Sequence, residues 1–302
     1  MSVLVVGSIA LDDVKTPAAE HKDLLGGSAS YAAVAASFYG PVRLVGVVGE
    51  DFPPEHRALF NARQIDVEGL EIVPGKTFRW SGEYEENLNN RKTLSIALNV
   101  FEKFEPKLPA KWKQTEFILL GNIAPSLQLQ VLKQVEHPKF IIADTMDLWI
   151  NLAKADLLEL LKKIDMLILN DSEVKLLTGE NNLIRAGRAV LKLGPKYVIV
   201  KKGEHGALLF GAKTGEFFST SAVPLEDIHD PTGAGDCFAG AFVGSLAQLG
   251  DTSFASLKKA VIQGTLVASF NVEEFSLRRL EKLTREEIAA RETAFMQSLS
   301  IV

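Results

Sequence analysis

The chain is short of the features that mark secreted and membrane-bound proteins. Its 302 residues include a single cysteine, Cys237. One thiol cannot form a disulfide within the chain, so we expect a reducing, cytoplasmic location. No apolar run approaches the roughly 20 residues of a membrane span. The apolar start of the chain lacks a basic lead and predicts a buried strand instead of a signal peptide. We therefore expect no membrane partner.

A basic excess is also missing, since the net charge is -5. Domains that bind nucleic acid usually carry a basic patch, so nucleic acid is not an expected partner. The five histidines are scattered without the spacing of metal ligands. No repeat or long linker divides the chain, and its 47% of apolar residues suffice for a large core. We predict one domain over residues 1–302.

The sequence does contain short runs of Val, Ile and Leu that alternate with segments of helical periodicity. The predicted strands are residues 3–7, 42–49, 116–122, 139–145, 165–170 and 197–203. The predicted helices between them are residues 28–40, 125–135, 146–164 and 183–194. Runs that are continuously apolar are typical of parallel strands buried on both faces. The pattern predicts an α/β fold with a mostly parallel central sheet.

Residues 70–99 break this rhythm. Residues 77–84 and 91–98 predict two half-exposed antiparallel strands, joined by a polar turn at 85–90. We expect a small β lid, built from this segment and from residues 11–25, over a ligand site. A plain surface hairpin or a dimer contact is the alternative. Phe78 and Trp80 would need cover, so we expect the lid also to form a homodimer.

The last third of the chain predicts helices. They cover residues 239–250, 252–270 and 284–299. Thr284 and Glu287 have the spacing of a capping box at the start of the last one.

The stretch HDPTGAGDCFAGAF, residues 229–242, combines a flexible turn with a helix start. Gly233, Ala234 and Gly235 would expose the free N–H groups of the first helical turn, which bind anions such as phosphate. Asp236 beside them suits a site that holds a phosphoryl group and also takes a proton from a hydroxyl. A simple helix cap is the alternative role for this carboxylate. Cys237 is expected to be buried packing.

This stretch resembles the C-terminal signature of the PfkB/ribokinase family of carbohydrate and nucleoside kinases, with Pro231 between Asp230 and Thr232. The resemblance implies a ribokinase-like three-layer α/β/α fold and an ATP-dependent phosphotransferase. It implies that Asp236 is the catalytic base, and that Gly233, Ala234 and Gly235 form the anion hole.

Two N-terminal stretches carry the same resemblance to the family. GSIALDD at 7–13 is similar to the first strand and loop, and places Asp12 where it would accept hydrogen bonds from substrate hydroxyls. GGSASYAA at 26–33 is similar to the Gly-Gly signature, in which Gly26 and Gly27 let substrate approach the backbone.

Two later stretches imply a nucleotide site. NDSE at 170–173 is similar to the family's Asn-x-x-Glu element, so Asn170 and Glu173 would organise Mg²⁺, Glu173 indirectly through water. KKGEHGA at 201–207 is similar to the loop that lines ATP, with Gly203 and Gly206 beside the phosphates.

Three further residues are candidates near the nucleotide. Lys201 follows a predicted strand and could contact a phosphate, with a solvated charge as the alternative. Thr232 lies just before the anion hole, among the expected ATP contacts. In some family members the loop at Asp230, with a segment like 271–276, binds a monovalent cation, so K⁺ is a possible cofactor besides ATP and Mg²⁺.

The acceptor is open between a sugar, a polyol and a nucleoside. The family often has Asn where this chain has Tyr31, which could stack on a cyclic substrate or be plain core. Arg91 in the lid is a candidate contact for substrate or for the transferred phosphate.

Two other functions are alternatives. One is a nucleotide-binding regulatory protein of the same fold without turnover. The other is an NAD-dependent oxidoreductase, disfavoured because no G-x-G-x-x-G follows the first strand. A near match to a P-loop at 206–215 puts apolar bulk where phosphate would lie, so it predicts a strand and turn.

Overall fold

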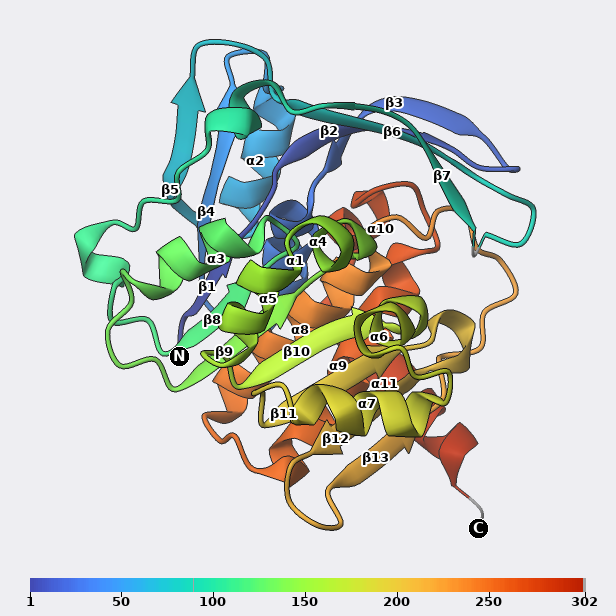
Figure 1. The fold of residues 1–302 in the computed structure, drawn as a ribbon. Helices are drawn as coiled ribbons and strands as arrows, with labels where there is room; N and C mark the ends of the chain where they lie inside the picture. The colour runs from blue at the N-terminus through green and yellow to red at the C-terminus, as the bar shows by residue number, and fades with distance from the viewer. Residues whose placement is uncertain (89, 301–302) are drawn as a thin grey trace.

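The computed structural model describes residues 1–88 and 90–300, in which a nine-stranded sheet forms the centre (Figure 1). Its strand order is β13-β12-β11-β10-β9-β8-β1-β4-β5. The strands are β1 Val3–Val6, β4 Val42–Gly49, β5 Asp66–Val73, β8 Phe117–Leu120, β9 Phe140–Asp144, β10 Met166–Asn170, β11 Tyr197–Lys201, β12 Ala207–Gly211 and β13 Phe217–Thr220. Pairing is parallel from β5 to β11, and β12 and β13 are antiparallel. The predicted mostly parallel sheet is confirmed, with all six predicted strands in it.

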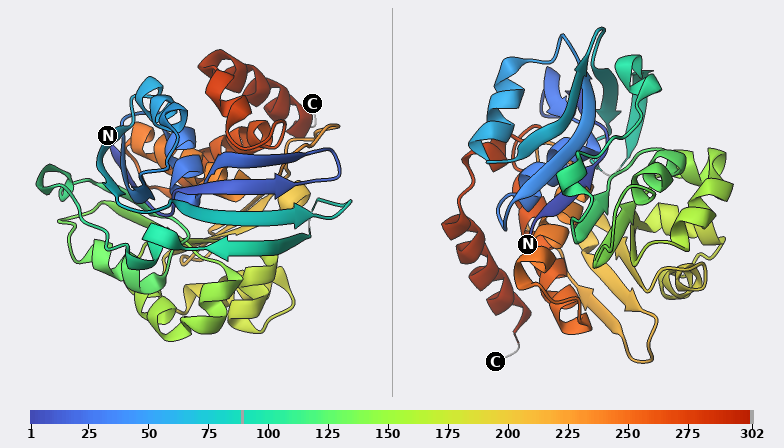
Figure 2. Two further views of the ribbon diagram at one scale, coloured as in Figure 1. Left: turned by 90° about the horizontal axis from the view of Figure 1, so that it is seen from above. Right: turned by 90° about the vertical axis from the view of Figure 1, so that its left-hand side faces the viewer.

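Helices cover both faces of this sheet, as the right-hand view of Figure 2 shows. Alternate strand residues enter opposite cores: Val5 faces one cluster and Leu4 the other. One layer holds α1 Ser28–Ala36, α2 Pro54–Ala62, α8 Ala234–Leu249, α9 Phe254–Asn271, α10 Arg278–Lys282 and α11 Arg285–Leu299. The other holds α3 Pro125–Leu132, α4 Asp147–Leu152, α5 Lys154–Leu161, α6 Asp171–Thr178 and α7 Leu183–Leu191. Short 3-10 helices are η1 Asn99–Lys103, η2 Ala110–Trp112 and η3 Gly203–His205.

A separate four-stranded sheet forms the lid, in the order β3-β2-β6-β7. Its strands are β2 Ala10–Lys15, β3 Glu20–Gly26, β6 Phe78–Tyr84 and β7 Arg91–Ala97. β6 and β7 are antiparallel as predicted, while β2 and β6 run parallel. Asn89, in the predicted turn, lies outside the described residues. From above, the lid strands project to one side of the helices (Figure 2, left).

Three sequence predictions about these elements need correction. The lid does not begin at residue 70, because residues 66–73 pair with β4 in the main sheet. Phe78 and Trp80 are already partly buried: Phe78 stacks on Phe101, and Trp80 packs on the lid's own apolar cluster. The predicted helix 146–164 is two helices, which meet at the non-helical Ala153.

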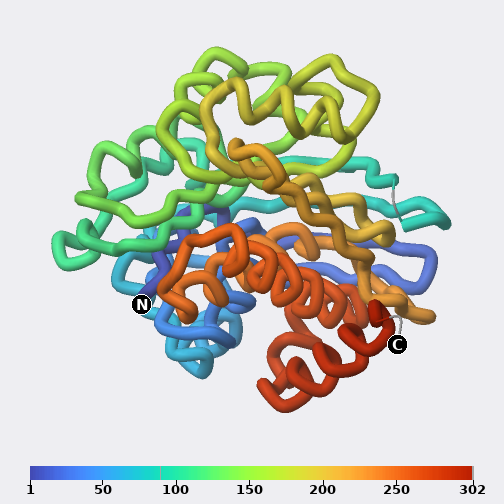
Figure 3. The backbone as a smooth tube through the Cα atoms, turned by 90° about the horizontal axis from the view of Figure 1, so that it is seen from below, coloured from blue at the N-terminus to red at the C-terminus, as the bar shows by residue number. Residues whose placement is uncertain are grey.

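The C-terminal helices agree with their predicted signals. Thr284 and Glu287 cap α11 reciprocally, so the predicted capping box is confirmed. Figure 3 shows α11 beside α9 at the surface of the molecule. Among the described helices, none combines the length and apolar character needed to cross a bilayer.

Candidate active site

The turn at Gly233 leads directly into α8. Gly233 is the residue before the helix, with φ 76°, and no side chain caps the first turn. A Cβ at this position would overlap the Tyr31 ring, so both the dihedral and the space require glycine. Ala234 N–H donates to Pro231 O at 3.2 Å. Within residues 1–88 and 90–300, the amides of Gly235 and Asp236 have no partner among the backbone hydrogen bonds that cap this helix.

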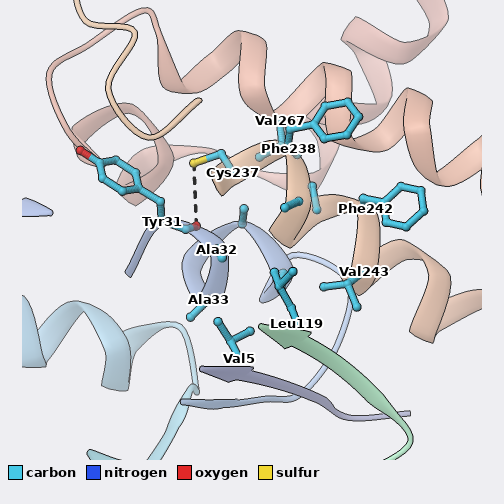
Figure 4. Packing of buried hydrophobic residues seen from close by; sticks show 14 of the residues in the cluster. Val5, Tyr31, Ala32, Ala33, Leu119, Cys237, Phe238, Phe242, Val243 and Val267 are labelled. Carbon is cyan, nitrogen blue, oxygen red and sulfur yellow. Dashed lines mark hydrogen bonds between the residues drawn. The ribbon is translucent and has the colours of Figure 1, made fainter. Parts of the chain in front are cut away.

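Tyr31 and Cys237 belong to the core beneath this turn (Figure 4). The Tyr31 side chain is 1% exposed, which favours the packing role over stacking on a substrate. The Cys237 thiol is fully buried and donates to Asn271 Oδ1 at 3.3 Å, with Tyr31 O a longer alternative acceptor at 3.8 Å. The expected packing role of Cys237 is confirmed.

Asp236 lies in the first turn of α8 and keeps part of its surface exposed. Burial of its carboxyl, and then the charge of Asp144, raise its pKa to about 7. The charges of Lys201 and Arg91 act in the opposite direction. A carboxyl group with a pKa near neutrality can accept and release a proton at physiological pH, as a general base must.

The carboxyl ends of β9 and β11 bring Asp144 and Lys201 together beside this helix. Lys201 Nζ lies 3.3 Å from Asp144 Oδ2, and both side chains are largely buried. Sequence reasoning missed Asp144. Its signal was the polar end of an otherwise apolar predicted strand, a common position for functional groups in α/β sheets.

Asn170 and Glu173 meet at the start of α6, directly after β10. They form a capping box, in which Glu173 N donates to Asn170 Oδ1 at 2.8 Å and Asn170 N donates to Glu173 Oε2 at 2.7 Å. Burial raises the pKa of Glu173 to about 7, against the nearby charge of Lys201. The two residues of the predicted Asn-x-x-Glu element are thus brought together and fixed by the helix start.

Asp12 lies on β2 of the lid and is 4% exposed. Its Oδ1 has no hydrogen-bond partner among the described residues. Burial, and then the charges of Asp230 and Asp236, raise its pKa to about 8. Gly26 lies against the Asp12 carboxyl group, where a Cβ would collide with it, and Gly27 has φ 88°. The predicted substrate residues Asp12, Gly26 and Gly27 are therefore adjacent.

The loop before the turn is tied to the segment after α9 and to the lid. Asp230 is fully buried and accepts from Thr232 N at 2.8 Å and from Ser276 N at 3.0 Å. Asn271 Nδ2 donates to Thr232 O at 2.8 Å, and Thr232 Oγ1 donates to Tyr84 OH of β6 at 3.1 Å. The predicted association of Asp230 with residues 271–276 is present, and the link from Thr232 to the lid was not foreseen.

A family model described as pfkB family carbohydrate kinase matches residues 3–282. The chain belongs to this family. Membership confirms the resemblance noted in the sequence, the ribokinase-like fold and the expectation of a carbohydrate or nucleoside kinase.

This pfkB-family chain is similar to kinases of several named activities. It is 28% identical over 248 residues to a cytidine kinase of Thermococcus kodakarensis, covering 80% of this chain and 87% of the relative. A putative ribokinase II from E. coli, solved with ATP and Mg²⁺, matches with a TM-score of 0.79 and 21% identity over 98% of this chain and 99% of that one. A nucleoside kinase of Burkholderia thailandensis, solved with inosine, matches with a TM-score of 0.79 and 20% identity over 98% of each chain. At these identities the two structures show the shared fold.

Three predicted contacts lie at the margin of the site in this pfkB-family member. Arg91 is exposed on β7, with its guanidinium carbon 5.4 Å from the centre of the Trp80 ring, and its charge reaches Asp236. Gly206, with φ 83°, packs against Thr220 O, and Gly203 begins a 3-10 turn. The two glycines have clear structural roles, and a role in binding nucleotide stays a prediction.

Proposed function

We propose that this chain transfers the γ-phosphoryl group of ATP to a hydroxyl of a nucleoside, sugar or polyol, with Asp236 as the base. The observation that carries the proposal is the placement of a carboxyl group of pKa about 7 in the first turn of α8, beside amides without a backbone partner. A cytidine kinase among the relatives supports a nucleoside as the first acceptor to try.

Each step of the proposed transfer can be assigned to a group in the site. Asp12 Oδ1, which has no partner among the described residues, would accept a hydrogen bond from the acceptor. Asp236 would take the proton of the reacting hydroxyl as its oxygen bonds the γ-phosphorus. The bond from that phosphorus to the β,γ-bridging oxygen breaks, and its electron pair leaves with ADP. The Gly233–Gly235 turn would bind the phosphoryl oxygens, through the amides of Gly235 and Asp236 above all.

Mg²⁺ bound to the ATP phosphates would neutralise the charge that develops during transfer. Asn170 and the buried carboxyl of Glu173 fit a role in holding this ion through water. Residues 1–88 and 90–300 contain no cluster of three His, Cys, Asp or Glu side chains that could hold a metal, so phosphate oxygens and water would complete its shell. The proposed nucleotide contacts are Gly203, Gly206 and Thr232. We also propose that a monovalent cation binds at Asp230.

A homodimer through the lid and a cytoplasmic location also belong to the proposal. The support for the dimer is that Leu94 and Ile96 of β7, and Leu98 after it, are about half exposed. β7 is also the edge strand of the lid sheet, so its outer backbone groups are open to another strand. Arg91 at the start of this strand is the lid residue proposed to contact substrate.

The function is tested by screening ADP release with nucleosides, sugars and polyols, followed by Asp236→Asn with the best acceptor. We expect kcat to fall by roughly 10²–10⁴-fold, because the base is lost. The affinity for ATP should stay close to that of the wild type. Undiminished turnover of Asp236→Asn would exclude Asp236 as the base. A protein that binds ATP but releases no ADP with any acceptor would favour the alternative of a regulatory protein without turnover.

A further inference from the structure

The buried ion pair between Asp144 and Lys201 spans one strand of the central sheet. Asp144 ends β9 and Lys201 ends β11, and β10 lies between them. Two strand spacings amount to about 10 Å, which a lysine side chain can cross. The two side chains are 7% and 17% exposed, and the Nζ–Oδ2 distance is 3.3 Å. The pair therefore closes over the carboxyl end of β10, where α6 begins.

Asp144 is fixed on its other side. Its Oδ1 accepts from Thr145 N at 2.8 Å. Its backbone carbonyl accepts from Gln128 Nε2 at 3.0 Å, and the same amide group reaches Gly121 O at 2.9 Å. Gln128 is fully buried. The carboxylate that holds the lysine is thus itself held by the ends of two neighbouring strands.

This arrangement sets the ammonium group against the anion-binding turn. A Cβ built on Gly235 would lie 2.8 Å from Lys201 Nζ. The Lys201 charge also lowers the pKa of Asp236 and of Glu173. Burial by itself would lower the pKa of Lys201, but Asp144, Glu173 and Asp236 raise it, so the ammonium stays charged.

Stability does not explain such a pair. Burying an ion pair costs desolvation free energy that the attraction often fails to recover, and apolar replacements of the whole pair can be neutral. A fixed ammonium near the developing charge of a transferred phosphoryl group is, by contrast, a strong source of rate. We propose that Lys201 contacts the transferred phosphoryl group, and that Asp144 is the positioning residue that holds Lys201 against Gly235. This inference rests on the proposed function and deepens it.

The test is a double-mutant cycle with Asp144→Asn, Lys201→Met and the double variant. We expect each single variant to lose on the order of 100-fold in kcat. Because Asp144 acts through Lys201, the double variant should be no slower than Lys201→Met alone. The acid limb of kcat should move to lower pH in Asp144→Asn, which loses a charge that raises the pKa of Asp236. It should move to higher pH in Lys201→Met, which loses a charge that lowers it.

A second readout needs no acceptor and no turnover. Aluminium fluoride with ADP and Mg²⁺ imitates the phosphoryl group in transfer, and its affinity can be measured by calorimetry. We expect both single variants to bind this complex on the order of 100-fold more weakly, while ADP alone binds within about 3-fold of the wild type. The matched controls are Lys196→Met and Asp165→Asn, which break the ion pair of 2.7 Å at the opposite end of β10 and β11. They should leave both readouts unchanged.

Wild-type kcat and analogue affinity in Asp144→Asn would overturn the inference. So would additive losses in the cycle, or a loss of kcat with an unshifted acid limb, either of which marks a purely structural pair. A wild-type protein that releases no ADP with any acceptor would defeat the proposed function instead. In that case the analogue affinities of Asp144→Asn and Lys201→Met, compared with those of the two control variants, would still decide the role of the pair.

Discussion

Because Gly235 lacks a side chain, the Lys201 ammonium group can lie close to its backbone. A methyl group there would come within 2.8 Å of Nζ, and the flexible lysine would have to move away. The backbone of Gly235 does not have positive φ, so alanine fits the helix and gains helix propensity. We predict that Gly235→Ala keeps or raises the melting temperature while kcat falls by roughly 10- to 100-fold.

Gly40→Ala is the matched control, because a Cβ there would be at an ordinary 3.5 Å from Met1 O. It should leave kcat unchanged. A fall in melting temperature of Gly235→Ala that parallels its loss of kcat would indicate a folding defect instead of a displaced ammonium.

Asp12 makes the stability of the ligand-free protein depend on pH. Its pKa is about 8 in the folded chain, against the ordinary 3.8 of an aspartate side chain, chiefly because the carboxyl group is buried. Between these values the unfolded chain releases this proton and the folded chain keeps it, so the contribution to stability falls as the pH rises. We predict that, between pH 5 and pH 8, the melting temperature of Asp12→Asn falls by about 5 °C less than that of the wild type.

The control for Asp12 is the exposed Asp227→Asn, which should follow the wild type. Equal slopes for Asp12→Asn and the wild type would show that the Asp12 carboxyl is not protonated in the folded state. The same variant should lose affinity for the acceptor, because the group that binds it is also the group that destabilises the empty site.

Residues whose role is local could be found from the sequence. Asp236 and Gly233 belong to one helix start, and a glycine turn before a helix carries its own signal. The polar end of its strand marks Asp144, but its pairing with Lys201 could not be found, because Lys201 comes 57 residues later and two strands away. The packing of Tyr31 under Gly233 is equally non-local, so the sequence left its role open.

At the scale of elements, the lid and the turn before α8 are connected. Tyr84 at the end of β6 is buried in the lid cluster, and its hydroxyl accepts from Thr232 Oγ1 at 3.1 Å. This hydrogen bond joins the sheet proposed to cover the acceptor to the loop proposed to bind phosphate. Movement of the lid should therefore affect both.

We predict that Tyr84→Phe raises the KM for the acceptor by about 2- to 10-fold, the range expected from one neutral hydrogen bond. ATP hydrolysis without acceptor should rise relative to transfer, since a looser lid admits water. Tyr39→Phe serves as the control, because it removes a comparable bond of 2.9 Å from Tyr39 OH, just after the C-terminal end of α1, to Gln263 Oε1. Unchanged coupling of hydrolysis to transfer in Tyr84→Phe would separate the lid from the turn.

Elements with a clear pattern of apolar residues could be predicted from the sequence. Elements whose assignment depends on the strand or helix they pack against could not. The other parallel strands were predicted from their continuous apolar runs. β5 instead has mixed burial, so the sequence pattern places its residues 70–73 in the lid, whereas they pair with β4 in the main sheet. The break at Ala153 between α4 and α5 has no proline or glycine to mark it.

For the whole molecule, the unpaired edge of the lid sheet at β7 predicts that two copies of the chain form a dimer. Leu94 and Ile96 are 51% and 55% exposed on β7, the edge strand of the lid sheet. We predict that light scattering gives twice the 33.0 kDa chain mass for the wild type and the single mass for Ile96→Glu, because a buried unpaired carboxylate would disrupt the interface. Leu152→Glu, at a more exposed leucine at the end of α4 and outside the lid sheet, should keep the wild-type mass. A wild-type protein that stays monomeric at micromolar concentration would contradict the proposed dimer, and the exposed face of β7 would then have to be covered by something other than a second copy of the chain.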